Sequence, residues 1–147
     1  MPDRKTVERA RKDAREGKSA STQAGEFVRE EMEHIRQGKH GARSTKQAIA
    51  IGLSKARRAG VDLPPPKQGT TSEETRHHAE RDLENVGHEP SPRRSRSTHR
   101  ALEREGHSAA SKQALSRQAS SAARKRSHAA RSRSARKAAR TRARRSS

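Results

Sequence analysis

Residues 21–60 read STQAGEFVREEMEHIRQGKHGARSTKQAIAIGLSKARRAG, and this stretch decides the fold. It contains two amphipathic patterns separated by a glycine-containing loop. The first pattern predicts a helix over about 22–37, with Thr22 as its N-cap and Gly38 as its C-terminal stop. Apolar residues recur there at intervals of three and four and form one face, which consists of Ala24, Phe27, Val28, Met32 and Ile35.

The second pattern predicts a helix over about 45–59. Ser44 and Gln47 have the S-x-x-Q spacing of a capping box, and Gly60 is expected to end the helix. Gly52 and Ala56 lie one turn apart, so another helix backbone can approach closely at this point.

Only residues 38–43 separate the two predicted helices, so we expect them to form an antiparallel hairpin. A thinner apolar stripe over 4–16 predicts a further helix that could complete the small core. Glutamates are dense on the 22–37 helix, and we expect them to lie on its solvated face, with Glu31 nearest the apolar edge.

The composition limits how much of the chain can pack. Of 147 residues only 26% are hydrophobic, Phe27 is the single aromatic residue, and the formal net charge is +19. Chains of low hydrophobicity and high net charge bury too little apolar surface to offset ordering entropy. We therefore expect a mostly α protein with extensive disorder: a small N-terminal helical hairpin, or three helices with 4–16, followed by a Ser/Ala/Arg-rich basic tail.

Charge divides the sequence into three predicted parts. Residues 1–62 form the helical region, with net charge +6, and residues 63–92 form a Pro-containing acidic linker with net charge −3. Within the linker, 72–85 predicts a polar helix capped by Ser72. Residues 93–147 form a basic low-complexity tail with net charge +16 and no acid after Glu105.

The basic charge indicates a polyanionic partner. A pI of 11.7 is typical of nucleic-acid-binding proteins. Binding to an anionic membrane would require apolar anchors beside the cations, but the basic tail offers only Leu102 and Leu115. No signal-peptide pattern follows the N-terminus, so we expect the protein to stay in the cytoplasm, at the nucleoid.

The tail supplies most of the candidate nucleic-acid-binding residues. Arginine makes bidentate contacts to phosphate and enters narrow minor grooves. The segment Ser91-Pro92-Arg93-Arg94 resembles the Ser-Pro-basic-basic turns of linker-histone tails, although a plain linker turn fits it better. The alternative role of the whole tail is to keep the protein soluble. The tail candidates are Arg93, Arg94, Arg96, Arg124, Lys125, Arg126, Arg131, Arg133, Arg136, Lys137, Arg140, Arg142, Arg144 and Arg145.

A second candidate site is the start of the 45–59 helix. Lys39, Arg43 and Lys46 surround its N-cap, where free N–H groups and the helix dipole favour an anion. An ordinary solvated helix start explains the same residues equally well.

Other chemistry has little support in the sequence. There is no cysteine, and the eight histidines lack the ligand spacing of zinc sites, so no metal or other cofactor is expected. No phosphate loop or nucleophile elbow is present, so we expect no enzyme. Aromatic stacking cannot be built from Phe27 alone, which favours duplex DNA over single strands. Arginine-rich RNA binding remains open.

The run from Gly38 to Arg57 resembles a family of small, basic, functionally uncharacterised proteobacterial proteins, which share the motif KHGxRSxKQAIAIGLSxAR. Ser21–Val28 and Lys112-Gln113-Ala114 are also similar to that family. Its members are often labelled DNA-binding or plasmid-stabilisation proteins. The resemblance covers most of residues 1–67 and implies a bacterial source and DNA binding, with no catalytic residues.

Three functions are open on the sequence. The first is a non-enzymatic, nucleoid-associated or histone-like protein that binds DNA phosphates with little sequence specificity. The second is an RNA- or ribosome-associated basic protein. The third is a protein-interaction adaptor with a solubilising tail. Self-association is compatible with each of them.

Overall fold

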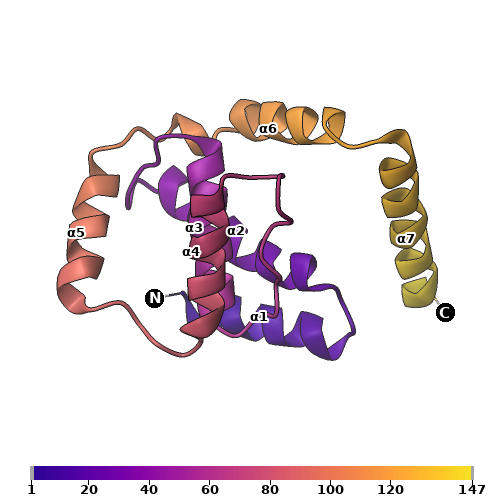
Figure 1. The fold of residues 1–147 in the computed structure, drawn as a ribbon, viewed down its shortest axis with the longest axis horizontal. Coiled ribbons are helices and arrows are strands. Elements are labelled where there is room, and N and C mark those ends of the chain that lie inside the picture. Colours follow the sequence, from indigo (N-terminus) through magenta and orange to yellow (C-terminus); the bar gives the residue numbers. More distant parts are fainter. Residues whose placement is uncertain (1, 147) are drawn as a thin grey trace. The chain divides into compact units, whose positions relative to one another are not determined.

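The computed structural model describes residues 2–146, which form seven α-helices and one 3-10 helix (Figure 1). Contacts divide the chain into two compact units, Met1–Ser111 and Lys112–Ser147. The first unit therefore includes part of the predicted basic tail. In chain order the elements are α1 (Arg4–Arg15), α2 (Ala20–Arg36), α3 (Thr45–Arg58), α4 (Glu73–Glu84), α5 (Pro92–Glu103), η1 (Ser108–Ala110), α6 (Lys112–Arg124) and α7 (His128–Ser146).

The expectation of extensive disorder is wrong, because helices run through the linker and the basic tail as well as the N-terminal region. A helix satisfies its backbone hydrogen bonds within its own segment, so it can form without an apolar core. Arginine and alanine, the two commonest residues of the tail, are among the best helix formers. The composition correctly indicates little tertiary burial there, but it does not measure local helicity.

Serine caps fix where several helices begin. The side chain of Ser44 accepts from the N–H of Gln47 at 3.1 Å, and the Gln47 side chain accepts from the N–H of Arg43 at 2.6 Å. This is a variant of the predicted capping box. Ser72 caps α4 as expected. The prediction of Thr22 as a cap is wrong, because α2 starts earlier and Ser19 caps it.

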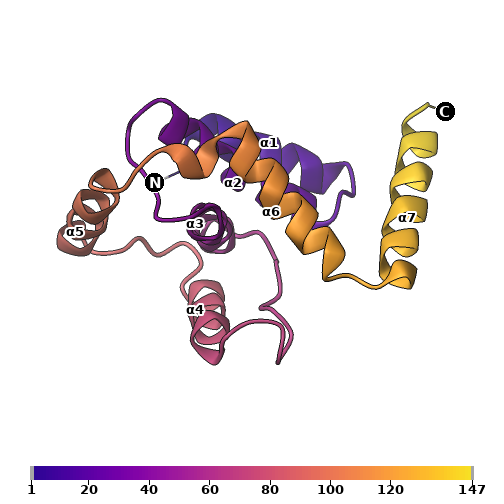
Figure 2. The ribbon, with the colours of Figure 1, turned by 90° about the horizontal axis from the view of Figure 1, so that it is seen from above.

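The core lies where α1, α2 and α3 meet. Phe27 is buried there among small side chains, with Val61 closing the cluster after α3. Figure 2, in which α3 is seen end-on, shows α1 and α2 on one side of it and α4 on the other. Few large side chains are available, so alanines at the contacts let the helices approach closely. The buried members of this cluster are Ala10, Ala24, Phe27, Ala56 and Val61.

The closest approach of α2 and α3 depends on a glycine. A Cβ added at Gly52 would lie 2.6 Å from the Cα and 2.9 Å from the N of Val28. No side chain fits in that space. The prediction that small residues on α3 allow a close backbone approach is thus confirmed at Gly52.

Arginines hold the proline segment and α4 against α3. Arg57 is buried, and its Nε donates to the carbonyl of Leu63 at 3.1 Å and its Nη2 to that of Pro64 at 3.2 Å. Burial lowers the pKa of Arg57, and the charge of Asp82 opposes this effect. Arg58 Nε pairs with Asp82 Oδ1 on α4 at 2.8 Å. Polar contacts thus replace the apolar packing that the composition cannot supply.

The last turn of α5 and the segment after it pack against the loop between α2 and α3. Gly41 N donates to the carbonyl of Leu102 at 2.8 Å, and Thr45 Oγ1 donates to that of Ala109 at 2.7 Å. A Cβ at Gly41 would lie only 2.0 Å from the carbonyl oxygen of Glu105. The glycine of the K-H-G-A-R run is therefore required for this contact.

The second unit consists of α6 and α7. Neither helix has a buried residue. Ser127 accepts from the N–H of Ala130 at 3.1 Å and caps α7. These helices are formed by local interactions and expose their charged side chains to solvent.

Candidate nucleic-acid interface

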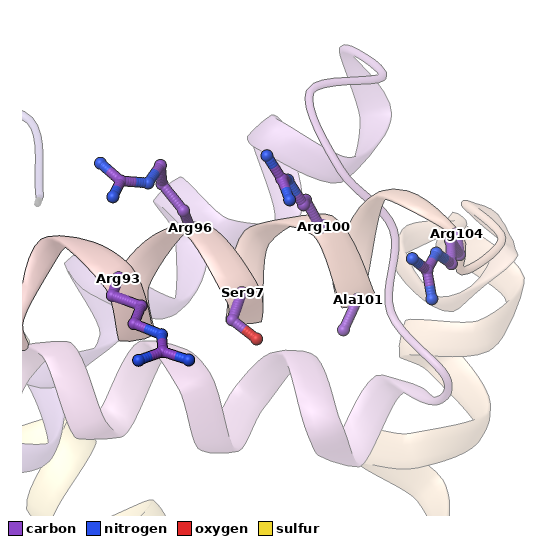
Figure 3. Close-up of a pocket in the computed structure, with 6 residues that line it drawn as sticks. All are labelled: Arg93, Arg96, Ser97, Arg100, Ala101 and Arg104. Atoms are coloured by element: carbon purple, nitrogen blue, oxygen red, sulfur yellow. The ribbon is translucent and has the colours of Figure 1, made fainter.

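A row of arginines follows one face of α5. Arg93, Arg96, Arg100 and Arg104 stand three and four residues apart, so they fall on neighbouring turns of the same face. They line an open groove with Ser97 and Ala101 (Figure 3). Figure 3 shows the side chains distributed along the helix rather than converging on one point. This arrangement suits an extended polyanion better than a single small anion.

The Ser-Pro-Arg-Arg segment is the start of this helix. Ser91 caps it, accepting from the N–H of Arg94 at 3.3 Å, and Pro92 occupies the first turn. The interpretation as a linker turn is therefore wrong, because proline at the first helical position is compatible with a helix. Arg94 is exposed but lies away from the α5 row, whereas Arg93 and Arg96 belong to it.

Sequence reasoning missed the second half of the α5 row. Arg100 and Arg104 were not among the predicted site residues, although their spacing from Arg96 continues the same face. The three- and four-residue spacing of these arginines is visible in the sequence. It indicates a shared face only if residues 92–103 are taken to be a helix. The nearby acid Glu103 is paired with His99 Nε2 at 3.0 Å.

The α7 helix carries a denser cationic face. On a helix of 3.6 residues per turn, the positions of this face cluster within about 100°. They are Arg133, Arg136, Lys137, Arg140 and Arg144. The remaining predicted α7 residues, Arg131, Arg142 and Arg145, project from the opposite side. Alanine, serine and threonine occupy the positions between the two sets.

Like charges face one another along α7. Arg133 and Lys137, Arg136 and Arg140, and Arg140 and Arg144 are i,i+4 neighbours. Each such pair destabilises an isolated helix by about 0.2–0.5 kcal/mol. No acid occurs after Glu105 to relieve this repulsion within the second unit. An external polyanion that lies along this face would relieve it.

Three predicted residues lie at the end of α6 and in the turn that follows. Arg124 is the last residue of α6, and Lys125 and Arg126 lie between the two helices. Arg126 donates to the carbonyl of Ala130 at 3.0 Å and to the hydroxyl of Ser134. Its guanidinium therefore also stabilises the first turns of α7.

The loop before α3 presents exposed cations at Lys39 and Arg43, and the first turn of α3 presents a third at Lys46. The N–H of Gln47, one of the N–H groups at this helix start, donates to the Ser44 side chain and so is not free for an anion. The Ser44 cap thus occupies one of the backbone N–H donors that an anion would bind. These cations therefore extend the exposed basic surface of the first unit.

Over residues 2–146, every helix is too short or too polar to cross a membrane. The fold and its surfaces define a small, strongly basic helical protein: a compact unit built on α1–α3, and cationic faces on α5 and α7. Residues 4–68 match the model of a family described as a family of unknown function (DUF6496). No curated protein matches the chain, and no solved structure does. The matched region ends before α4, so the cationic helices lie outside it.

Proposed function

We propose that the protein binds duplex DNA in the bacterial nucleoid, without enzymatic activity and with little sequence specificity, through phosphate contacts of α5 and α7. The observation that carries this proposal is the exposed five-cation face of α7, in a unit whose sequence contains no Asp or Glu. Its residues extend over about 16 Å of helix, from a rise of 1.5 Å per residue. Positive charges thus recur about every 4 Å, close to the 3.4 Å axial spacing of phosphates on one DNA strand.

The proposal of little sequence specificity is supported by the residue types on α7. Helix α7 contains no Asn or Gln, which read adenine in the major groove, and no aromatic residue for stacking. Its alanines and serines are small enough to let the helix backbone come close to the DNA. Phosphate contacts position a protein on the duplex but carry no sequence information.

The test compares two charge-matched triple variants of the full chain. In the face variant Arg133, Arg136 and Arg140 become Gln, and in the control Arg131, Arg142 and Arg145 become Gln. Both variants lose three charges from the same helix by the same substitution. Duplex binding is measured by fluorescence anisotropy across a series of salt concentrations, with random-sequence DNA.

The face variant should lose the larger part of its affinity. Each phosphate contact contributes about −0.9 to the slope of log K against log salt, so three lost contacts should reduce its magnitude by about 2.7. The control should change the slope much less. Equal losses would mean that α7 acts as a generic polycation without a binding face. Tighter binding to structured RNA than to duplex DNA at the same salt would favour the RNA-associated function instead.

A further inference from the structure

A cluster of histidines and carboxylates lies at the C-terminal half of α2 and in the loop that follows it. Glu31 and His34 belong to α2, and His40 lies in the loop that follows it. One ligand-type atom from each of these three residues lies within 4.8 Å of the others. The Glu31 side chain is fully buried, and the side chains of His40 and His34 are only 7% and 15% exposed. The prediction that Glu31 lies on a solvated face is therefore wrong.

The backbone of the next residue fixes the orientation of the His40 ring. Its Nδ1 lies 2.9 Å from the carbonyl oxygen of Gly41, which can only accept, so Nδ1 carries a proton. The loop is held in turn by the hydrogen bond from Gly41 N to Leu102. In the neutral ring Nε2 is then a bare acceptor. A protonated Nδ1 bonded to a carbonyl is the usual arrangement behind a metal-binding histidine.

The unprotonated Nε2 of His40 faces a carboxylate oxygen of Glu31. His40 Nε2 is 3.2 Å from Glu31 Oε2, but Glu31 Oε2 has no hydrogen-bond partner, so the two atoms are not aligned for a hydrogen bond. Two acceptors at this distance repel unless a cation lies between them. Ligand atoms of tetrahedral zinc, with bonds of about 2.0–2.2 Å, stand about 3.3–3.5 Å apart. The observed separation is close to that value.

The other oxygen of Glu31 is already occupied. Lys55 Nζ donates to Glu31 Oε1, which orients the carboxylate and leaves Oε2 as a single ligand atom. A partner of this kind outside the ligand set is characteristic of metal sites in proteins.

A second carboxylate pair adjoins the cluster through His34. Its Nε2 lies 3.6 Å from Glu30 Oε1 and 3.7 Å from Asp3 Oδ2. Glu30 is also buried, and its Oε2 has no hydrogen-bond partner. The Asp3 side chain is 65% exposed, so solvent screens its charge. With neutral histidines, the two buried carboxylates and the ammonium of Lys55 sum to a formal charge of −1. A bound cation would offset this charge, because an uncompensated buried charge is costly.

We propose that Glu31, His34 and His40 bind a divalent transition-metal ion of the zinc class, with a fourth position left for water. Two imidazoles and one carboxylate form a ligand set that zinc accepts. The ligands come from α2 and from the loop that contacts the segment after α5, so the ion would fasten that loop to α2. Metal ions commonly supply stability that a small core lacks. Sequence spacing did not reveal the site because the ligands follow E-x2-H-x5-H across a helix end.

The test is metal titration of the untagged full chain, freed of nucleic acid and stripped with a chelator. Zinc binding is measured by competition with a chromophoric chelator, and Co²⁺ is added separately to report coordination through its visible absorption. The variants are His40→Gln and Glu31→Gln, and the control is His88→Gln, which removes an exposed histidine outside the cluster. Far-UV circular dichroism of each metal-free variant checks that it is folded.

Wild type and the His88→Gln control should bind one equivalent of Zn²⁺ and give a tetrahedral Co²⁺ spectrum. Each ligand variant should bind Zn²⁺ at least about 100-fold more weakly than the wild type. Loss of a residue that only supports a ligand already lowers metal affinity by about 10–100-fold. Zinc should raise the melting temperature of the wild type and of the control only. Equal zinc affinity in all four proteins, or no stoichiometric binding by the wild type, would overturn the proposal and leave a buried ion-pair cluster. Neither outcome depends on DNA binding.

Discussion

Replacing Gly52 by alanine tests whether the contact of α2 with α3 limits the stability of the first unit. The new Cβ would lie 2.6 Å from the Cα of Val28 and 2.9 Å from its N. These are mostly backbone atoms, so a rotamer change cannot relieve the overlap and the helices must separate. Separation would also loosen the core cluster to which Phe27 and Ala56 belong.

Two effects of opposite sign decide the magnitude. Alanine favours a helix interior over glycine by about 0.8–1.0 kcal/mol. Overpacking typically costs about 1–3 kcal/mol, and a clash with backbone belongs at the upper end. The net expectation for Gly52→Ala is a loss of about 2 kcal/mol in the free energy of unfolding.

Gly25 provides a matched control on the partner helix. It lies inside α2, is exposed, and an added Cβ would meet nothing within 4 Å. Gly25→Ala should therefore show only the helix-propensity gain and stabilise the protein by up to about 1 kcal/mol. The two identical substitutions should differ by about 3 kcal/mol.

Urea unfolding followed by circular dichroism at 222 nm measures both variants against the wild type. The midpoint should fall for Gly52→Ala and rise for Gly25→Ala, with similar slopes. If Gly52→Ala were as stable as Gly25→Ala, the close approach of the two helices would not exist in solution. The packing account of the core would then be refuted.

Two further predictions concern the loop and the tail. Gly41→Ala should release the segment after α5 from the loop, because the new Cβ would lie 2.0 Å from the carbonyl oxygen of Glu105. Hydrogen exchange should show faster exchange at Ala42 and Ala110, and unchanged protection there would contradict this contact. The helicity of α6 and α7 should increase with added salt or polyphosphate, because both screen the like-charge pairs of α7. Circular dichroism of the full chain would show this increase, and a constant signal would argue against repulsion along the α7 face.

Local signals predicted the helix boundaries of the first unit well. Each of these signals acts on a backbone group only a few residues away, so the sequence alone displays the interaction. They are the Ser44 and Gln47 capping pair, the Ser72 cap, and the glycines that follow α2 and α3. The shift of the α2 cap from Thr22 to Ser19 shows the limit of this reasoning. Two hydroxyl residues three apart can each begin a helix, and Ser19 accepts from the N–H of Thr22 itself.

The state of the basic tail could not be deduced from hydropathy, because hydropathy reports burial rather than helix formation. The helices α6 and α7 have no buried residue, as the low hydropathy indicates, and yet they are regular helices. Their alternation of alanine and arginine at three- and four-residue spacing was the relevant signal. Applied to 92–104, the same periodicity would have added Arg100 and Arg104 to the candidate interface.

The buried carboxylates of α2 show why the remaining site was missed. Glu31 stands four residues after Phe27 and four before Ile35, so helical spacing places it on the apolar face. A glutamate in that position indicates either a solvated edge or a buried partner, and the sequence of the helix alone does not distinguish the two. The partners are Lys55, 24 residues away on another helix, and His40, whose loop is held by a segment some 60 residues further along. A buried charge with partners so distant in sequence becomes recognisable only when the fold brings them together. The glutamate that breaks the apolar pattern of α2 is therefore the residue from which a functional search of this unit should start.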